Sequence, residues 1–195
     1  MQNISHRKKF MQKRIIVNLP AKSMDFITQL KAETSRRNID LVVQAVMEHP
    51  EEFDNLYQLI YSDIPRIPNI AAWAVEKCVA QNPAFLAPYI LEVIDFLPQI
   101  KYSGLRRSLA KSLTFCDIPE ERLGEILDIC LEWLQDPKIK TAVKIYSMHI
   151  LLDIARKEPD IRFELIPVIE SQMEHNTVGF KNRGEKTIKA LHQLA

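Results

Sequence analysis

Glycine is scarce in this chain, which has four among 195 residues, at positions 104, 124, 179 and 184. Tight turns between strands and phosphate-binding loops both rely on positive φ angles, which glycine adopts at the lowest energetic cost. Four glycines that form no cluster therefore argue against a β-rich fold. They also argue against a nucleotide-binding loop.

Motifs of known catalytic sites are missing as well. The chain contains no GxxxxGK[ST], GxGxxG, HExxH, GxSxG or CxxC pattern, and its five histidines are scattered. His149 lies in an apolar stretch, where we expect a core or groove histidine with one hydrogen bond rather than a metal ligand or general base. The sequence thus predicts a protein that is not an enzyme and uses no cofactor.

Long apolar runs and paired cysteines are also absent. No run approaches the ~20 residues that span a bilayer, and the amino terminus lacks the apolar core of a signal peptide. Cys78, Cys116 and Cys130 are odd in number and lie among apolar residues, which is typical of buried free thiols in a reducing compartment. We therefore expect a cytoplasmic protein that does not contact a membrane.

The net charge of +1 conceals an uneven distribution. Six of the 26 basic residues and no acidic residue lie in residues 1–22, so residues 23–195 carry 20 basic and 25 acidic side chains. We expect residues 1–22 to be a basic tail without fixed structure and residues 23–195 to be a single domain. Three alternatives for the tail are a nucleic-acid or membrane-surface arm, a targeting peptide, or translation upstream of a true start at Met24. The domain itself is mildly acidic, unlike a typical nucleic-acid binder.

The most informative stretch that is present runs from Pro119 to Lys157. Its first part has apolar residues at i, i+3, i+4, i+7, i+8 and i+11 from Leu123, which is the stripe of an amphipathic helix. After the break at Asp136 and Pro137, the second part is apolar over most of its circumference. The stretch therefore predicts a helical hairpin whose second helix is covered on several sides.

Similar helix signals recur from Met24 to the carboxyl terminus. We expect a first helix capped by Ser23 and a second that starts at Asn38 or Asp40. Further helices are expected over 50–61, 69–81, 83–97, 104–115, 119–134, 138–157, 160–174 and 178–194. Prolines open one helix of each later pair, at positions 50, 83, 119 and 159. About ten helices with this phasing predict a repeat array of about five hairpins rather than a simple bundle.

One hairpin carries a family resemblance. Asp136 and Pro137, followed by Ile139, Lys140 and Ala142, resemble the signature of HEAT repeats, in which an Asp between the helices precedes a Val/Ile–Arg/Lys pair. Leu105 and Arg106 resemble the same pair without the Asp. The resemblance implies an all-α fold of the HEAT and ARM type, a right-handed solenoid, and a scaffold or binding role.

Basic residues near the starts of second helices are the main candidates for partner contacts. In a stacked array, equivalent positions align and could form a positive ridge. Trp73, beside small neighbours, could be reached by a ligand, whereas Trp133 is expected in the core. The candidate contact residues are Trp73, Arg106, Arg107, Lys140, Lys144 and Arg183. The alternative for the basic residues is structural, because such side chains in HEAT-like hairpins often bond an Asp of the turn, such as Asp136.

These features favour a non-enzymatic module that binds a protein or peptide partner on a concave face. The alternative is a nucleic-acid-binding protein resembling the HEAT-like alkylpurine DNA glycosylases, which hold a damaged base with aromatic and carboxylate residues on a basic surface.

Overall fold

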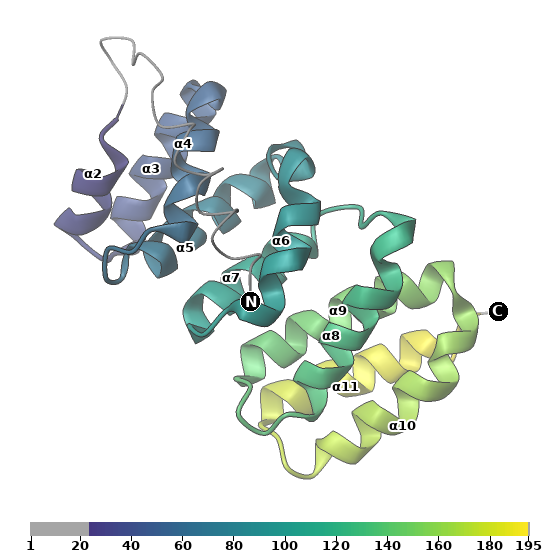
Figure 1. The fold of residues 1–195 in the computed structure, drawn as a ribbon. Helices are drawn as coiled ribbons and strands as arrows, with labels where there is room; N and C mark the ends of the chain where they lie inside the picture. Colours follow the sequence, from purple (N-terminus) through teal and green to yellow (C-terminus); the bar gives the residue numbers. More distant parts are fainter. Residues whose placement is uncertain (1–23, 195) are drawn as a thin grey trace, which may run out of the picture.

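The computed structural model describes residues 24–194, which form ten α-helices and no strand. The helices pair into five consecutive hairpins that follow one another along the molecule (Figure 1). The hairpins are α2 (Phe26–Ala32) with α3 (Arg36–Glu48), α4 (Phe53–Gln58) with α5 (Ile67–Gln81), α6 (Ile90–Phe96) with α7 (Ser103–Leu113), α8 (Leu123–Gln135) with α9 (Thr141–Lys157), and α10 (Arg162–Met173) with α11 (Val178–Leu191). The prediction for the basic tail lies outside the described residues.

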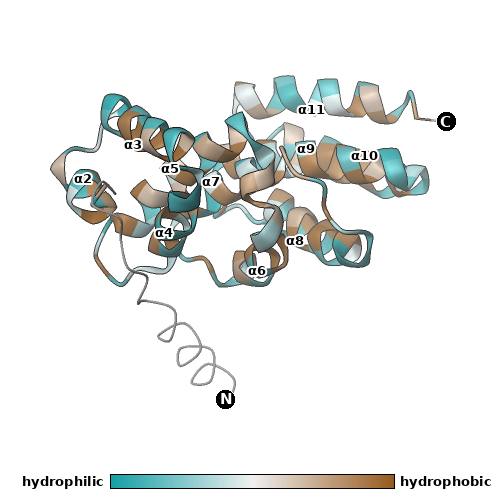
Figure 2. Cartoon of the chain, turned by 90° about the horizontal axis from the view of Figure 1, so that it is seen from above, coloured by the Kyte–Doolittle hydropathy of each residue, from teal (hydrophilic) through white to brown (hydrophobic). Residues whose placement is uncertain are grey.

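The second helices of the hairpins form a layer of their own. Each contacts the next one along the chain, from α3 to α5, α7, α9 and α11, and the row is visible from above (Figure 2). The first helices α2, α4, α6 and α8 lie on the other side of this row. Two stacked layers of helices, each hairpin in contact with its neighbours, make an α-solenoid. The prediction of an all-α superhelix of five hairpins is thus confirmed.

Several helices begin at other residues than the sequence suggests. The first helix is capped by Asp25, whose side chain accepts a hydrogen bond from the Thr28 amide, and Ser23 lies outside the described residues. The second is capped by Ser35 rather than started by Asn38. Asn38 is instead buried, and its amide group donates to the carbonyls of Gln29 and Glu33. A side chain that could cap a helix is used here to join α2 to α3.

Prolines shape the first helices as predicted. Short 3₁₀ helices begin with Pro50, Pro83 and Pro159, and another directly follows Pro119. The third helix is divided into Pro50–Glu52, α4 and Leu59–Tyr61, and the fifth into Pro83–Phe85, Ala87–Tyr89, α6 and Leu97–Gln99. A proline lacks the amide hydrogen that continues an α-helix. The first helices are therefore shorter and less regular than the second helices.

The core is continuous from α2 to α11 and lies between the layers. Trp133 is 4% exposed, which confirms its predicted place in the core. Cys78 and Cys130 are buried, Cys116 is half-buried, and all three thiols are free. Stacked aromatic rings join α4 to the next hairpin, with Tyr57 and Tyr89 centred 4.0 Å apart and Phe53 and Phe85 4.7 Å apart. This cluster was not singled out from the sequence, because its partners are about 32 residues apart and follow no helical spacing.

Candidate functional site

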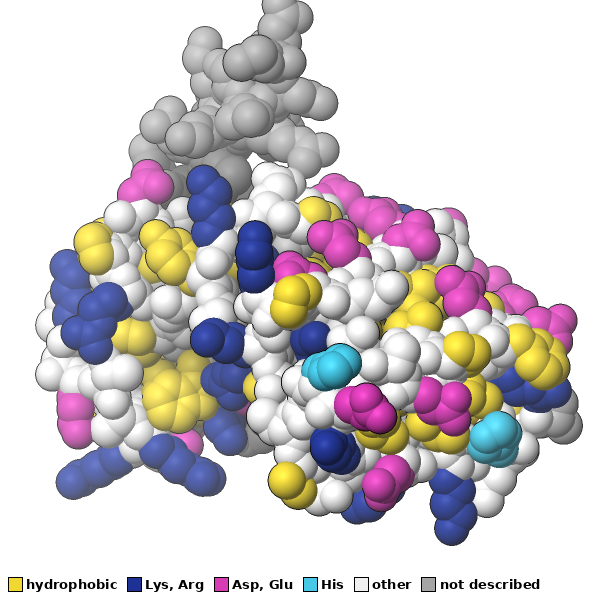
Figure 3. Space-filling view, turned by 90° about the horizontal axis from the view of Figure 1, so that it is seen from below, with side chains coloured by type: hydrophobic (Ala, Val, Ile, Leu, Met, Phe, Trp, Pro, Cys, Tyr) yellow, Lys and Arg dark blue, Asp and Glu magenta, His cyan; other side chains and the backbone are white. Residues whose placement is uncertain are grey.

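The two layers of helices carry opposite charge. The five second helices contain thirteen Lys or Arg residues and five Asp or Glu residues, a net charge of +8. The first helices, with the 3₁₀ helices that flank them, contain three basic and thirteen acidic residues, a net charge of −10. Seen from below, acidic side chains gather along the upper right of the molecule and basic ones over its left and lower parts (Figure 3). The domain is thus acidic as a whole but has one basic layer.

Helix α5 exposes only a narrow stripe of residues to solvent. In α5, only positions 69, 73, 77, 80 and 81 retain exposure between residues 69 and 81. This spacing of three and four residues marks one face of a helix. We define the second-helix face by seven residues with half-exposed side chains on four adjacent helices: Trp73 and Lys77 of α5, Arg107 and Lys111 of α7, Tyr146 and His149 of α9, and Arg183 of α11.

On α5, Trp73 and Lys77 lie one turn apart. Both are half-buried, and neither forms a hydrogen bond or ion pair with any residue in 24–194. The residues next to Trp73 in the sequence are small: Ala71, Ala72 and Ala74 are alanines, and all three are fully buried. The expectation that Trp73 could be reached by a ligand is consistent with this geometry. Lys77 is an addition to the predicted residues, and its helical spacing from Trp73 could have identified it.

Between α5 and α7 lies a buried carboxylate. Glu76 has a side chain that is 2% exposed, and its oxygens accept hydrogen bonds from Lys111 Nζ at 2.7 Å and Ser108 Oγ at 3.0 Å. Arg107 Nη2 lies 3.6 Å from the same carboxylate and donates to Ser108 Oγ. A buried charge is stable only when it is paired and hydrogen-bonded. Glu76 therefore holds Arg107 and Lys111, which would otherwise repel each other at i, i+4.

On α9, Tyr146 and His149 lie three residues apart. Their rings meet edge to face with centroids 6.4 Å apart. Burial is the main cause that lowers the pKa of His149, and the nearby Arg183 lowers it further. The imidazole Nε2 is buried without a hydrogen-bond partner in the described part of the chain, so the expected single hydrogen bond at this atom is not formed. His149 is thus kept neutral beside a guanidinium.

Two of the predicted contact residues are used inside the fold. Arg106 donates to the Ile100 carbonyl before α7 and stacks over the Trp133 ring, 5.6 Å from its centroid. Lys144 is 2% exposed, and its Nζ donates to the Leu134 carbonyl at the end of α8 over 2.8 Å. Burial lowers the pKa of Lys144, and Asp136 opposes this shift.

The alternative structural role is therefore the one that Arg106 and Lys144 have. Each is the fourth residue of its helix and ties that helix to a backbone carbonyl of the preceding segment. The bonded groups are the carbonyls of Ile100 and Leu134, rather than the Asp136 carboxylate that the sequence suggested. Lys140 is exposed at the start of α9. Of the six predicted residues, Trp73, Arg107 and Arg183 lie on the second-helix face, and Lys144 is removed from it by burial.

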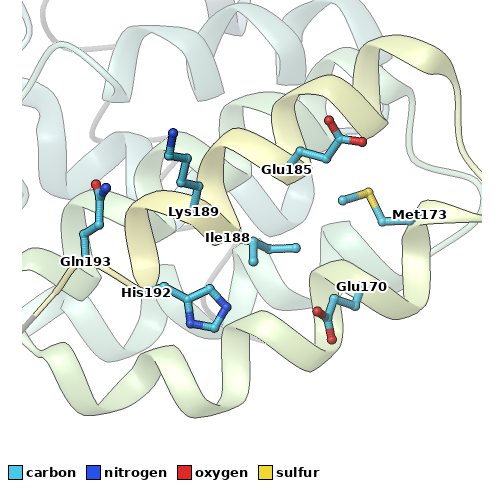
Figure 4. Close-up of a pocket in the computed structure, with 7 residues that line it drawn as sticks. All are labelled: Glu170, Met173, Glu185, Ile188, Lys189, His192 and Gln193. Atoms are coloured by element: carbon cyan, nitrogen blue, oxygen red, sulfur yellow. The ribbon is translucent and has the colours of Figure 1, made fainter.

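A separate cavity of about 600 Å³ lies at the carboxyl-terminal end of the solenoid, between α10 and α11. Met173 and Ile188 point toward each other at its floor, while Glu185 and Lys189 point away from α10 (Figure 4). Met173 also covers Gly184, where an added Cβ would lie 2.7 Å from its Cε. The cavity has no buried polar group aimed into it among the residues that line it.

Two further kinds of feature are absent from the described residues. Within residues 24–194, no group of three His, Cys, Asp or Glu side chains is arranged to hold a metal ion. No helix in the same range has the length and apolar character needed to cross a membrane.

The comparisons with known proteins agree with this architecture. Searches of curated proteins and of solved structures each returned no match. A scan of protein families matches residues 26–191 to the HEAT repeat domain. The match covers all ten described helices, from the first residue of α2 to the last residue of α11, and the chain therefore belongs to the HEAT repeat family.

Proposed function

We propose that this protein is a non-enzymatic interaction module that binds an acidic segment of a partner protein on its second-helix face. HEAT repeats generally mediate protein interactions or scaffolding. The observation that carries the finer proposal is the separation of charge, +8 on the second helices against −10 on the first. Complementary charge steers a partner and fixes its orientation on such a surface.

The residues of the face suit such a partner. Lys77 has no ion partner in residues 24–194, and Arg107 and Lys111 share the single carboxylate of Glu76. These three cations thus exceed their local acidic partners by two charges. Trp73 and Tyr146 add large rings that can pack against apolar side chains of a partner.

Nucleic acid is the second candidate, because a phosphate backbone also complements a basic face with accessible rings. Two observations favour the protein partner. A long polyanion would come within about one Debye length of the acidic first helices, since helix layers lie ~10 Å apart. In addition, Glu76, three residues after Trp73 in α5, is buried and bonded on both oxygens, so it is not free to act on a bound base.

Fluorescence anisotropy with labelled probes tests the proposal. We expect a labelled Glu/Ser peptide to bind at low salt, with affinity that falls as salt rises, and a Lys/Ser peptide of the same length not to bind. Lys77→Glu should weaken binding roughly tenfold, the equivalent of 1.4 kcal/mol. The matched control is Lys31→Glu, the same charge change on the exposed side of α2 in the first-helix layer.

Two results would contradict the proposal. The first is no binding of the Glu/Ser peptide at any salt concentration, and the second is equal weakening by Lys77→Glu and Lys31→Glu. A 20-base-pair DNA duplex serves as the competing probe. Tighter binding of this duplex than of the peptide, with a steep salt dependence, would favour the nucleic-acid candidate instead.

A further inference from the structure

The second-helix face changes character from one helix to the next. On α5 the exposed stripe presents the indole of Trp73 with Lys77 one turn further along, and on α7 it presents the cations Arg107 and Lys111. On α9 it presents the rings of Tyr146 and His149, and on α11 the guanidinium of Arg183. Within the second-helix face, helices that carry a ring, α5 and α9, therefore alternate with helices that carry cations without a ring, α7 and α11.

The distance between these helices sets a scale for a partner. Packed helices have axes 8–10 Å apart, and an extended chain advances ~3.3 Å per residue. A segment that crosses the helices therefore advances about three residues from one helix to the next. A segment that ran along a single helix would meet only one kind of side chain.

We infer that the partner segment is extended, crosses α5, α7, α9 and α11, and alternates apolar and acidic side chains at every third residue. This inference rests on the proposed function and names its ligand class. An apolar side chain packs on Trp73, and an acidic one pairs with Arg107 and Lys111. The next apolar side chain packs on Tyr146, and the next acidic one pairs with Arg183.

Contacts within the face support this order. The pairing of Arg107 and Lys111 with Glu76 leaves one net positive charge on the exposed stripe of α7. An acidic side chain of the partner neutralises this charge. On the neighbouring α9, the surface at Tyr146 is less suited to a charge, because the ring of His149 lies against it and is held neutral. The contact at Tyr146 on α9 is therefore the apolar one, between the cationic contacts on α7 and α11.

A pair of synthetic peptides of identical composition tests the order. The first is Leu-Ser-Ser-Glu-Ser-Ser-Leu-Ser-Ser-Glu, and the second exchanges its inner Leu and Glu. We expect the first to bind the full chain at least tenfold more tightly, because the exchange places a carboxylate against Tyr146 and a leucine against two cations. Replacing Tyr146 with Ala should weaken binding of the first peptide and leave the second unchanged.

A double-mutant cycle links the ring to its partner residue. If the inner Leu of the peptide packs on the ring, changing that Leu to Ser should cost no further affinity in Tyr146→Ala. Equal affinity of the two peptides, or independent effects in the cycle, would overturn the inferred order. If both peptides fail while the Glu/Ser peptide binds, only this inference is lost. If the Glu/Ser peptide also fails, the proposed function is lost with it.

Discussion

Removing the Glu76 carboxylate should destabilise the fold by about 3 kcal/mol. Breaking a fully buried ion pair by removing one partner costs ~3–5 kcal/mol, because the other charge is left without compensation. The side chain of Glu76 is 2% exposed, but those of Lys111 and Arg107 are 26% and 37% exposed. Water can therefore partly compensate the two cations in Glu76→Ala, which places the expected loss at the lower end of this range.

A milder change separates charge from shape. In Glu76→Gln the side chain keeps its length and can still bond Ser108 and Lys111, so we expect a loss of roughly 1–2 kcal/mol. A double-mutant cycle with Lys111→Gln should show coupling of about 1 kcal/mol or more, since the two groups are 2.7 Å apart. Glu132→Gln, on the exposed side of α8, is the matched control and should change stability by less than about 0.5 kcal/mol.

Urea denaturation followed by helical circular dichroism measures these values, provided that the slope of free energy against urea stays constant. The same Glu76→Gln variant should bind an acidic peptide more tightly than the parent, because Arg107 and Lys111 lose their carboxylate partner. Lower stability together with higher affinity would be hard to explain by general damage to the fold. A loss below 1 kcal/mol in Glu76→Ala would refute the reasoning that this carboxylate is a buried, paired charge.

Two further predictions concern stability. Burial raises the pKa of Cys78 and of Cys130 from 9.0 to about 12. Above pH 9 the unfolded thiols ionise while the folded ones do not, so stability is full below pH 9 and is lost as pH rises, by roughly 1.4 kcal/mol per thiol between pH 8 and 10. The double variant Cys78→Ala/Cys130→Ala should show a smaller alkaline loss in urea titrations at these pH values, and an unchanged loss would contradict the thiol assignment. Gly124→Ala should raise stability by up to about 0.5 kcal/mol in thermal melts, since the residue lies in the first turn of α8, where an added Cβ meets no atom within 4 Å. Gly184→Ala should give less or none of this gain, because its Cβ would press on Met173, and an equal gain at both positions would contradict this packing.

The architecture was predictable because it depends on short-range patterns. Apolar spacing and proline placement both act within one hairpin, and they located all five hairpins of the described chain. Helix starts were less predictable where one residue had two uses. Asn38 could cap a helix, yet its amide group bonds Gln29 and Glu33 across a hairpin. Local sequence does not distinguish a cap from such a contact.

The candidate site was only partly predictable, because it depends on which side of each helix faces inward. Lys140 and Lys144 are equally basic, but α9 begins at Thr141 rather than at the expected Lys138. The resulting orientation buries Lys144 and leaves Lys140 exposed. Glu76 was missed although a lone carboxylate in an alanine-rich stretch is unusual. Its partners lie 32 and 35 residues away on α7, and only the packing of two hairpins brings them together.

Helix stability accounts for the acidic layer better than for the basic face. Negative charge near a helix start interacts favourably with the helix dipole, and the first turns of three 3₁₀ helices contain Glu51, Glu52, Glu120, Glu121 and Asp160. Much of the acidic charge of the first helices therefore has a local explanation. It need not indicate a partner.

Among the cations of the second helices, Lys77 has no such explanation. Arg106 and Lys144 lie near helix starts, where the dipole disfavours a positive charge, but both are bonded to backbone carbonyls. Lys77 lies in the interior of α5, beyond the reach of either helix end, and has no partner in residues 24–194. Side-chain burial, capping and ion pairing within this part of the chain do not explain its charge. The proposed binding of an acidic partner would account for this charge, and Lys77→Glu is for that reason the most informative single substitution in this protein.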